Sequence, residues 1–235
     1  MADQQGKRIK ESYKIKGLRK YIASKMAESL RDYPQGSGST YIETDNLLAL
    51  KKELKAENPN ISMTALFVKV TAEALRKHPK LNSALINNED FIVYDSINIG
   101  VGIGLEEGVM MIVIKEAQDK DIFEISEELQ EGIALQKQGK LGFDRSTGST
   151  FTLSNMGMLG IEQVTAFLTP PETGILAIGS TKKQLVVQDD DSTAIKKMTC
   201  FSTTINHAAV DGLHAGLFMK TVNEILQNPK DHMGL

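Results

Sequence analysis

The feature that most constrains this chain is a strand pattern followed by a helix pattern near its C-terminus, with a polar corner between them. Residues 199–205 are mainly β-branched, hydroxyl or aromatic residues, which is typical of a strand. Residues 213–226 place leucine, valine and isoleucine close to helical spacing, which predicts a helix with one apolar face. His207, Asp211 and Gly212 occupy the corner. A domain in which helices pack on a sheet is therefore expected.

His207 at this corner is a candidate general base. Histidine is the side chain whose ordinary pKa allows proton exchange near neutral pH. In a structural interpretation, Asp211 would be the N-cap of the last helix, Gly212 would ease the turn, and His207 would be an ordinary half-buried histidine. On spacing alone this structural interpretation is favoured. No metal site is expected, because one histidine and one aspartate do not form a ligand set, even with His214, and Cys200 is the only cysteine.

Length and composition place the chain among ordinary globular proteins. Its 235 residues can bury a substantial core, and 41% of them are hydrophobic. A formal net charge of −3 gives no electrostatic reason to expect a nucleic acid or an anionic membrane as partner. One cysteine excludes an internal disulfide framework. No apolar run approaches the roughly 20 residues of a membrane span, and the N-terminus lacks the apolar core of a secretion signal, so a cytoplasmic protein is expected.

Hydrophobic spacing and turn residues predict a series of helices and strands. Helices are expected at residues 18–30, 46–57 with Asp45 as N-cap, 62–77, from 121 or 122 to 137, and 213–226. Strands are expected at residues 40–43, 91–94, 96–105, 109–114, 149–154, 174–178 and 199–205. By composition, residues 32–39 are predicted to form a loop and residues 106–108 a hairpin turn. The series predicts one compact unit in which helices cover a mixed sheet.

Glycines alternate with valine and isoleucine in the predicted strand 96–105, at positions 100, 102 and 104. They lack the G-x-G-x-x-G spacing, and a hairpin turn rather than a helix follows them, which argues against a nucleotide-phosphate loop. Glycines on one face of a strand more simply indicate the close approach of another backbone or of a ligand.

A second candidate for chemistry lies at the end of the predicted strand 149–154. Ser154 and Asn155 end this strand, and a glycine-bearing loop follows them. A hydroxyl at such a strand end can donate a hydrogen bond to a developing oxyanion. Alternatively, the two residues only close a turn. The residues alone leave both interpretations open.

Several segments together resemble one known family. They are residues 17–26, 138–141, 150–160, 170–179 and 207–212. In this order, over roughly residues 15–230, they are similar to the catalytic domain of the dihydrolipoyl acyltransferases of 2-oxo acid dehydrogenase complexes. The His-x-x-x-Asp-Gly pattern is shared with the chloramphenicol acetyltransferases of the same structural superfamily. The combination of segments is far more specific than any single motif.

The resemblance implies the α/β fold of chloramphenicol acetyltransferase, a coenzyme A-dependent acyltransferase fold with a mixed sheet covered by helices. It implies a homotrimer, which could assemble further into a cubic or dodecahedral cage. The implied reaction moves an acyl group, expected to be acetyl, between a dihydrolipoyl thiol and coenzyme A. Coenzyme A and acyl-CoA would be substrates, the dihydrolipoyl group would be supplied in trans by a lipoyl-domain protein, and no metal would take part.

The resemblance also assigns roles to the candidate site residues. His207 corresponds to the general base and Ser154 to the hydroxyl that stabilises the oxyanion. Asp211 corresponds to a structural partner that fixes the corner, with Arg19 as the side chain it would engage. In this family the site lies between subunits, so His207 and Ser154 would come from different chains. The residues that bind coenzyme A are not identified by the resemblance.

The chain departs from the family pattern around the corner and in its domains. Asn206 and Ala208 stand where the family usually has an aspartate and a basic residue, and His214 is placed as in the chloramphenicol enzymes. Residues 1–15 are predicted to form a flexible arm and residues 16–235 the catalytic domain, with no lipoyl or peripheral subunit-binding domain. These departures favour an alternative, an acetyl-CoA-dependent transferase with a small hydroxyl or amine acceptor. A non-catalytic trimeric scaffold is a further alternative, which the intact site residues argue against.

Overall fold

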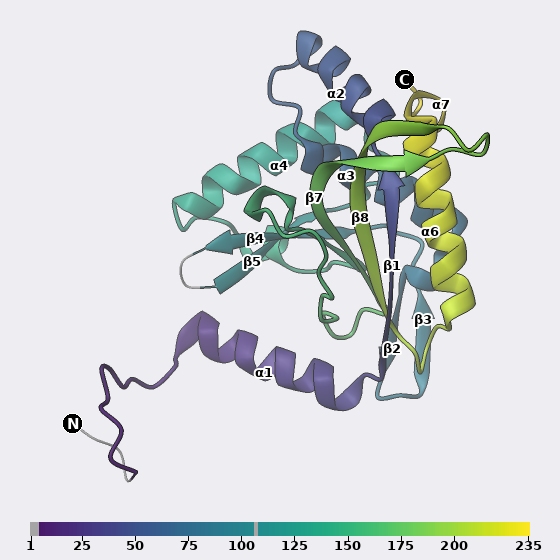
Figure 1. The fold of residues 1–235 in the computed structure, drawn as a ribbon. Helices are drawn as coiled ribbons and strands as arrows, with labels where there is room; N and C mark the ends of the chain where they lie inside the picture. The colour runs from purple at the N-terminus through teal and green to yellow at the C-terminus, as the bar shows by residue number, and fades with distance from the viewer. Residues whose placement is uncertain (1–4, 106–107) are drawn as a thin grey trace.

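The computed structural model describes residues 5–105 and 108–235, which form a mixed sheet and the helices around it (Figure 1). The main sheet has the strand order β1-β8-β7-β6-β4-β5. Its strands are β1 (Gln35–Glu43), β4 (Ile99–Leu105), β5 (Gly108–Ile114), β6 (Phe151–Asn155), β7 (Gly174–Val187) and β8 (Thr193–Asn206). β6 runs parallel to β4 and β7, whereas the other neighbouring strands are antiparallel. The predicted mixed sheet is therefore confirmed. The short strands β2 (Ser83–Ile86) and β3 (Asp90–Val93) form a separate pair.

Side-chain caps mark the start of some of the helices. The helices are α1 (Gly17–Asp32), α2 (Asp45–Glu57), α3 (Met63–Lys77), α4 (Ile122–Lys137), α5 (Phe143–Ser146), α6 (Gly212–Gln227) and α7 (Pro229–Met233). Ser62 is the N-cap of α3, and its side chain accepts the N–H of Ala65. Asp121 forms a capping box with Glu124 at the start of α4. Such caps satisfy backbone N–H groups that a helix leaves without partners.

The core lies between the sheet and helices α3, α4 and α6. Phe201 on β8 meets Phe67 of α3 edge to face, with the ring centroids 5.6 Å apart. Phe151 on β6 packs against Phe218 of α6 with the centroids 5.7 Å apart. All four rings are buried, so each contributes several kcal/mol through apolar burial and packing. This core fixes β8, whose last residue precedes His207.

The connection between β6 and β7, at residues 156–173, crosses the opposite face of the sheet. Gln163 Nε2 donates to Ser39 Oγ at 3.0 Å, and the N–H of Leu168 donates to Gln35 Oε1 at 3.4 Å. On the same face the hydroxyls of Ser39 and Ser202 are 2.8 Å apart. The sheet is thus covered on one face by helices and on the other by a long, hydrogen-bonded connection.

The predicted helices and strands are confirmed with shifts at their ends, but the predicted loop 32–39 is wrong from Gln35 onward. These residues form the first part of β1, paired with β8 from Gln35↔Asn206 to Glu43↔Met198. Their glycine and serine content resembles a loop. In the sheet, however, the serine hydroxyls pair with hydroxyls of β8, as between Ser37 and Thr204 at 2.9 Å. Tertiary contacts therefore override the local composition.

Two smaller expectations are corrected by the structure. Thr44, not Asp45, is the N-cap of α2, and Asp45 is the first helical residue. At Gly100 the close neighbours are side chains rather than another backbone: a Cβ there would lie 2.6 Å from Met111 Cε and 3.0 Å from Ser149 Cβ, whereas a Cβ on Gly104 would meet nothing within 4 Å. Residues 106 and 107 of the predicted hairpin turn lie outside the described residues.

Helix α1 stands apart from the other helices (Figure 1). Ser29 is its buried residue, and Tyr21 and Leu30 are exposed at 62% and 60%. In the described part of the chain, no helix is long and apolar enough to span a bilayer. The division of the chain into an N-terminal arm and one catalytic domain stays a prediction.

Candidate active site

His207 directly follows β8 and is held by the start of β1. Its backbone N–H donates to the carbonyl oxygen of Pro34 at 2.7 Å. Its ring lies against Gly36, since a Cβ on Gly36 would be only 2.8 Å from His207 Cδ2. The residue is exposed, and the described part of the chain gives the ring no hydrogen-bond partner. An accessible imidazole on an anchored backbone is suited to proton transfer with a bound group.

The ring lies at a pocket of about 370 Å³ between the sheet and α6. The sheet contributes a wall of small and hydroxyl residues, and α6 contributes another of small residues and one methionine. The lining residues are Gly36, Ser37, Gly38, Ser39, Thr40, Thr203, Ile205, His207, Gly212, Ala215, Gly216 and Met219. Among these lining residues only the histidine is titratable. The pocket walls therefore suit an uncharged, extended part of a ligand that carries polar atoms.

Asp211 supports the corner from the helix side. Its Oδ1 accepts the N–H of Leu213 at 3.1 Å, which makes it the N-cap of α6. The same oxygen lies 2.8 Å from His214 Nδ1, and this contact lowers the pKa of the Asp211 carboxyl. Arg19, the expected partner of Asp211, lies instead beside Gly108 of β5. Within one chain, the partner that the structure gives Asp211 is therefore His214.

Ser154 is half-buried on β6 and lies far from His207 of the same chain. In the sheet Ser154 pairs with Ala177, and Ala177 pairs with Ser202. His207 comes five positions after Ser202. A strand rises about 3.3 Å per residue, and neighbouring strands lie about 4.8 Å apart. Five residues along β8 and two strand spacings across the sheet therefore separate His207 from Ser154 by about 19 Å. One chain therefore does not bring the two predicted site residues together.

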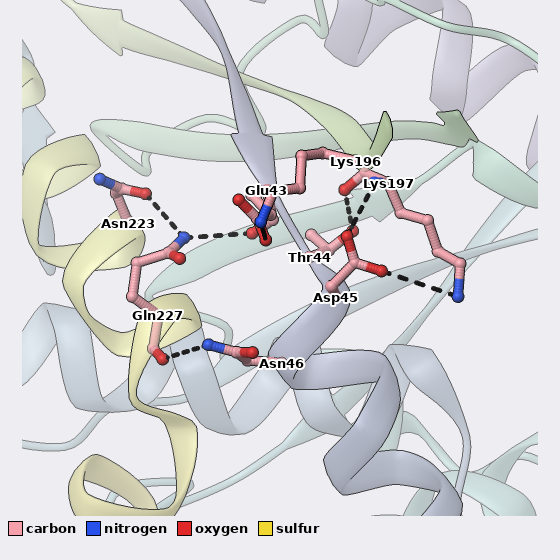
Figure 2. Close-up of polar contacts among 8 residues, drawn as sticks. All are labelled: Glu43, Thr44, Asp45, Asn46, Lys196, Lys197, Asn223 and Gln227. Atoms are coloured by element: carbon pink, nitrogen blue, oxygen red, sulfur yellow. Dashed lines mark hydrogen bonds and ion pairs between the residues drawn. The ribbon is translucent and has the colours of Figure 1, made fainter. Parts of the chain in front are cut away.

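A cluster of polar contacts joins α6, β1 and β8 at the end of the pocket walls away from His207 (Figure 2). Gln227, the last residue of α6, donates from Nε2 to the carbonyl oxygen of Glu43 at the end of β1, at 3.2 Å. Asn46 Nδ2 donates to the carbonyl oxygen of Gln227 at 2.7 Å. The carboxylate of Asp45 accepts the N–H of Lys197 on β8 at 2.8 Å. Since β1, β8 and α6 are joined here, the walls of the pocket are fixed at the end opposite His207.

A buried carboxyl, Glu172, lies between the strands that carry the candidate residues. It is 2% exposed, and its two oxygens accept hydrogen bonds from Ser149 Oγ at 2.5 Å and from Thr152 Oγ1 at 2.6 Å. Burial raises the pKa of Glu172 from 4.5 to about 7, although both hydroxyl contacts lower it. Burying a carboxylate without a cation is costly, which favours the protonated form.

Replacing Glu172 with Gln should remove a pH dependence of stability. Because the pKa is about 7 when folded and 4.5 ordinarily, the stabilisation from the protonated carboxyl is complete below pH 4.5. It is lost as the pH rises through 7. Between these values the free energy of unfolding of the native protein, measured relative to Glu172→Gln, should fall by roughly 3 kcal/mol. Urea unfolding of both proteins across this range measures it, and parallel pH curves would contradict the assignment.

The residue patterns did not reveal three features of this site. Gly36 lies in a stretch of loop composition, and its contact with His207 depends on the pairing of β1 with β8. Glu172 has no distinguishing signal within the 170–179 segment, and its burial is a tertiary property. The bond between His214 and Asp211 has one local signal, the i, i+3 spacing at a helix start. Within residues 5–105 and 108–235, no group of His, Cys, Asp and Glu side chains is placed to hold a metal ion.

Comparison with known proteins identifies the fold and the family. A solved chloramphenicol acetyltransferase aligns with 90% of this chain and 96% of its own, with a TM-score of 0.57 and 17% identity. A solved probable dihydrolipoamide acetyltransferase from Listeria monocytogenes 4b F2365 aligns with 93% of this chain and 94% of its own, with a TM-score of 0.87 and 30% identity. The dihydrolipoyllysine-residue acetyltransferase component of the acetoin cleaving system of Bacillus subtilis (strain 168) is 32% identical over 222 residues, 92% of this chain.

These likenesses define first a class: the fold is that of the chloramphenicol acetyltransferase-like acyltransferases, as expected. The family model of the 2-oxoacid dehydrogenases acyltransferase catalytic domain matches residues 7–234. The chain belongs to this family. It spans 55% of the Bacillus subtilis relative and 50% of the corresponding pyruvate dehydrogenase component of Zymomonas mobilis, so it covers about half of such proteins.

Proposed function

We propose that this chain transfers an acyl group, acetyl in the simplest case, between a dihydrolipoyl thiol and coenzyme A. The observation that carries the proposal is the exposed His207 beside a pocket of about 370 Å³, with its backbone held by Pro34 and its ring lying against Gly36. Family membership and the 32% identical relative, a dihydrolipoyllysine-residue acetyltransferase, support the same chemistry. We further propose that the protein works in the cytoplasm and receives the dihydrolipoyl group from a lipoyl-domain protein.

In the proposed mechanism, neutral His207 takes the proton from the attacking thiol, whose ordinary pKa of about 8.5 leaves it mostly protonated at neutral pH. The sulfur forms a bond to the thioester carbonyl carbon, and the carbonyl oxygen becomes an oxyanion. The Ser154 hydroxyl donates a hydrogen bond to this oxyanion, a contact worth on the order of 3 kcal/mol. The bond between the carbonyl carbon and the sulfur of the acyl donor then breaks, and the departing thiolate takes the proton from the His207 imidazolium.

We propose that each site forms between two subunits of a homotrimer, because His207 and Ser154 of one chain are about 19 Å apart by strand register. His207 of one subunit would then face Ser154 of the next. Exposed apolar side chains follow Ser154 along the chain and agree with such an interface: Met158 and Leu159 are 90% and 71% exposed. Asp211 acts as a structural support in this site through its helix cap and its contact with His214.

An acceptor assay tests the proposal. Purified protein is given acetyl-CoA with dihydrolipoamide, or with a chloramphenicol-like alcohol or an amine, and thioester formation and coenzyme A release are followed. We expect transfer to dihydrolipoamide, and a loss of about 10²- to 10⁴-fold in kcat for His207→Ala. His232→Ala on α7 is the matched control, since α7 follows the C-terminal end of α6 (Figure 1), whereas His207 precedes the N-terminal end of α6. This variant should keep full activity.

The other acceptors decide between the alternatives. Transfer to an alcohol or amine alone would replace the proposal with a chloramphenicol-type acetyltransferase. That result would fit His214 and its contact with Asp211 at the corner. No transfer to any acceptor by a folded trimer would favour a scaffold.

A further inference from the structure

We propose that Glu172 is a positioning residue that holds Ser154 in place through Thr152. This inference rests on the proposed function, in which Ser154 stabilises the oxyanion. Glu172 itself is buried on all sides and touches no part of the pocket beside His207, so it does not meet substrate there. Its contacts run instead to the strand that carries Ser154.

The path from Glu172 to Ser154 is short. Thr152 and Ser154 are two positions apart on β6, so their side chains lie on the same face of the strand. The Thr152 hydroxyl donates to Glu172 Oε2 at 2.6 Å, and Ser149, just before the strand, donates to Oε1 at 2.5 Å. The Glu172 carboxyl therefore accepts two hydrogen bonds at the start of β6, one on each oxygen.

The main chain around Glu172 is anchored to the corner of His207. The neighbouring Thr173 accepts the N–H of Asn206 at its carbonyl oxygen, at 2.9 Å. Its hydroxyl lies 2.6 Å from Ser83 Oγ, and Glu172 itself forms an isolated bridge with Ala84 of β2. The carboxyl thus holds β6 against a frame that also carries the residue before His207. A hydroxyl that must meet an oxyanion within hydrogen-bond distance needs such a frame.

Glu172→Gln and Thr152→Val test the role with little change in shape. Above pH 7, where the Glu172 carboxyl is ionised and accepts both hydroxyls, Gln keeps one acceptor oxygen but presents an N–H₂ donor in place of the other. Val removes the Thr152 hydroxyl. In the full chain, each variant should lower kcat for acetyl transfer to dihydrolipoamide by about 10- to 100-fold, with the KM of both substrates within about twofold of the native value. The control is Ser126→Ala on α4, which removes a buried hydroxyl that donates to the carbonyl oxygen of Asn60 at 2.9 Å. This variant should keep native kcat.

A double-mutant cycle separates positioning from general loosening. If Glu172 acts through Ser154, then Glu172→Gln should change kcat by less than about twofold in a Ser154→Ala background. A full, additive loss in that background would overturn the proposal.

Amide hydrogen exchange gives a readout that needs no activity. Glu172→Gln should speed exchange in β6 by at least about tenfold while the helix α4 keeps native protection. If no acceptor is acylated by the native protein, the proposed function fails, and exchange still decides whether Glu172 holds β6. Unchanged exchange in β6 would overturn the positioning role even in an active enzyme.

Discussion

Mixing His207→Ala subunits with Ser154→Ala subunits should restore acyl transfer that neither variant supports alone. In a site shared by two chains, a Ser154→Ala subunit still supplies His207, and a His207→Ala neighbour still supplies Ser154. In an equal, randomly assembled mixture, about one interface in four combines both intact residues. We therefore expect about a quarter of native kcat per site from the mixture, against losses of about 10²-fold or more for each variant alone.

The measurement uses the two variants unfolded together and refolded as a mixture, with acetyl transfer to dihydrolipoamide as the readout. Each variant refolded alone is one control. A mixture of His207→Ala with a chain that carries both substitutions is the second, because it contains no intact His207 and should stay inactive. Activity that does not rise above the sum of the separate variants, in mixed trimers demonstrated by differential tagging, would contradict a site shared between subunits.

The strand register is the physical reason for this expectation. Ser154 lies level with Ser202 across β7, and the chain must continue along β8 past Asn206 before it reaches His207. The core fixes both strands through Phe151 and Phe201. A movement that closed a gap of about 19 Å within one chain would have to break this sheet.

The sequence predicts the elements of this fold whose local signals and burial agree. Helix α3 has Ser62 as its N-cap and ends before a proline, and the core buries it as its apolar content requires. The corner from β8 to α6 was placed correctly because a β-branched strand, an aspartate N-cap and an amphipathic helix follow one another. These signals act within a few residues, so a single sequence contains them.

The sequence fails where a role depends on a distant strand. The first part of β1 has loop composition, but it forms a strand because it pairs with β8. It belongs to the site because Gly36 leaves room for the ring of His207. In the sequence Glu172 is a glutamate after two prolines without a further signal, and its burial and its contacts with β2 and β6 arise only in the fold. His207 and Ser154 were predicted as site residues from their motifs, and their roles stay predictions until the variants are measured.

Replacing Gly36 with alanine should cost far more activity than replacing Gly38, although both glycines lie on β1 and line the same pocket. A Cβ on Gly36 would be 2.8 Å from His207 Cδ2, whereas a Cβ on Gly38 meets nothing within 4 Å. The imidazole is exposed, so it can swing away from the added methyl with little loss of folding free energy. Its distance from the reacting thiol, however, would change by an amount comparable to the overlap.

A displacement of about 1 Å in a catalytic group can cost about 10²-fold in rate, and we expect a loss of this size in kcat for Gly36→Ala. Gly38→Ala adds a methyl to the pocket wall without touching the ring, so it should alter the KM of the acyl acceptor more than kcat, which should stay within about threefold. Steady-state kinetics and thermal unfolding of both variants measure this contrast. Equal kcat values for the two would show that β1 does not set the position of His207. A large loss of stability confined to Gly36→Ala would show that the ring cannot move aside, and that the contact belongs to folding rather than to catalysis.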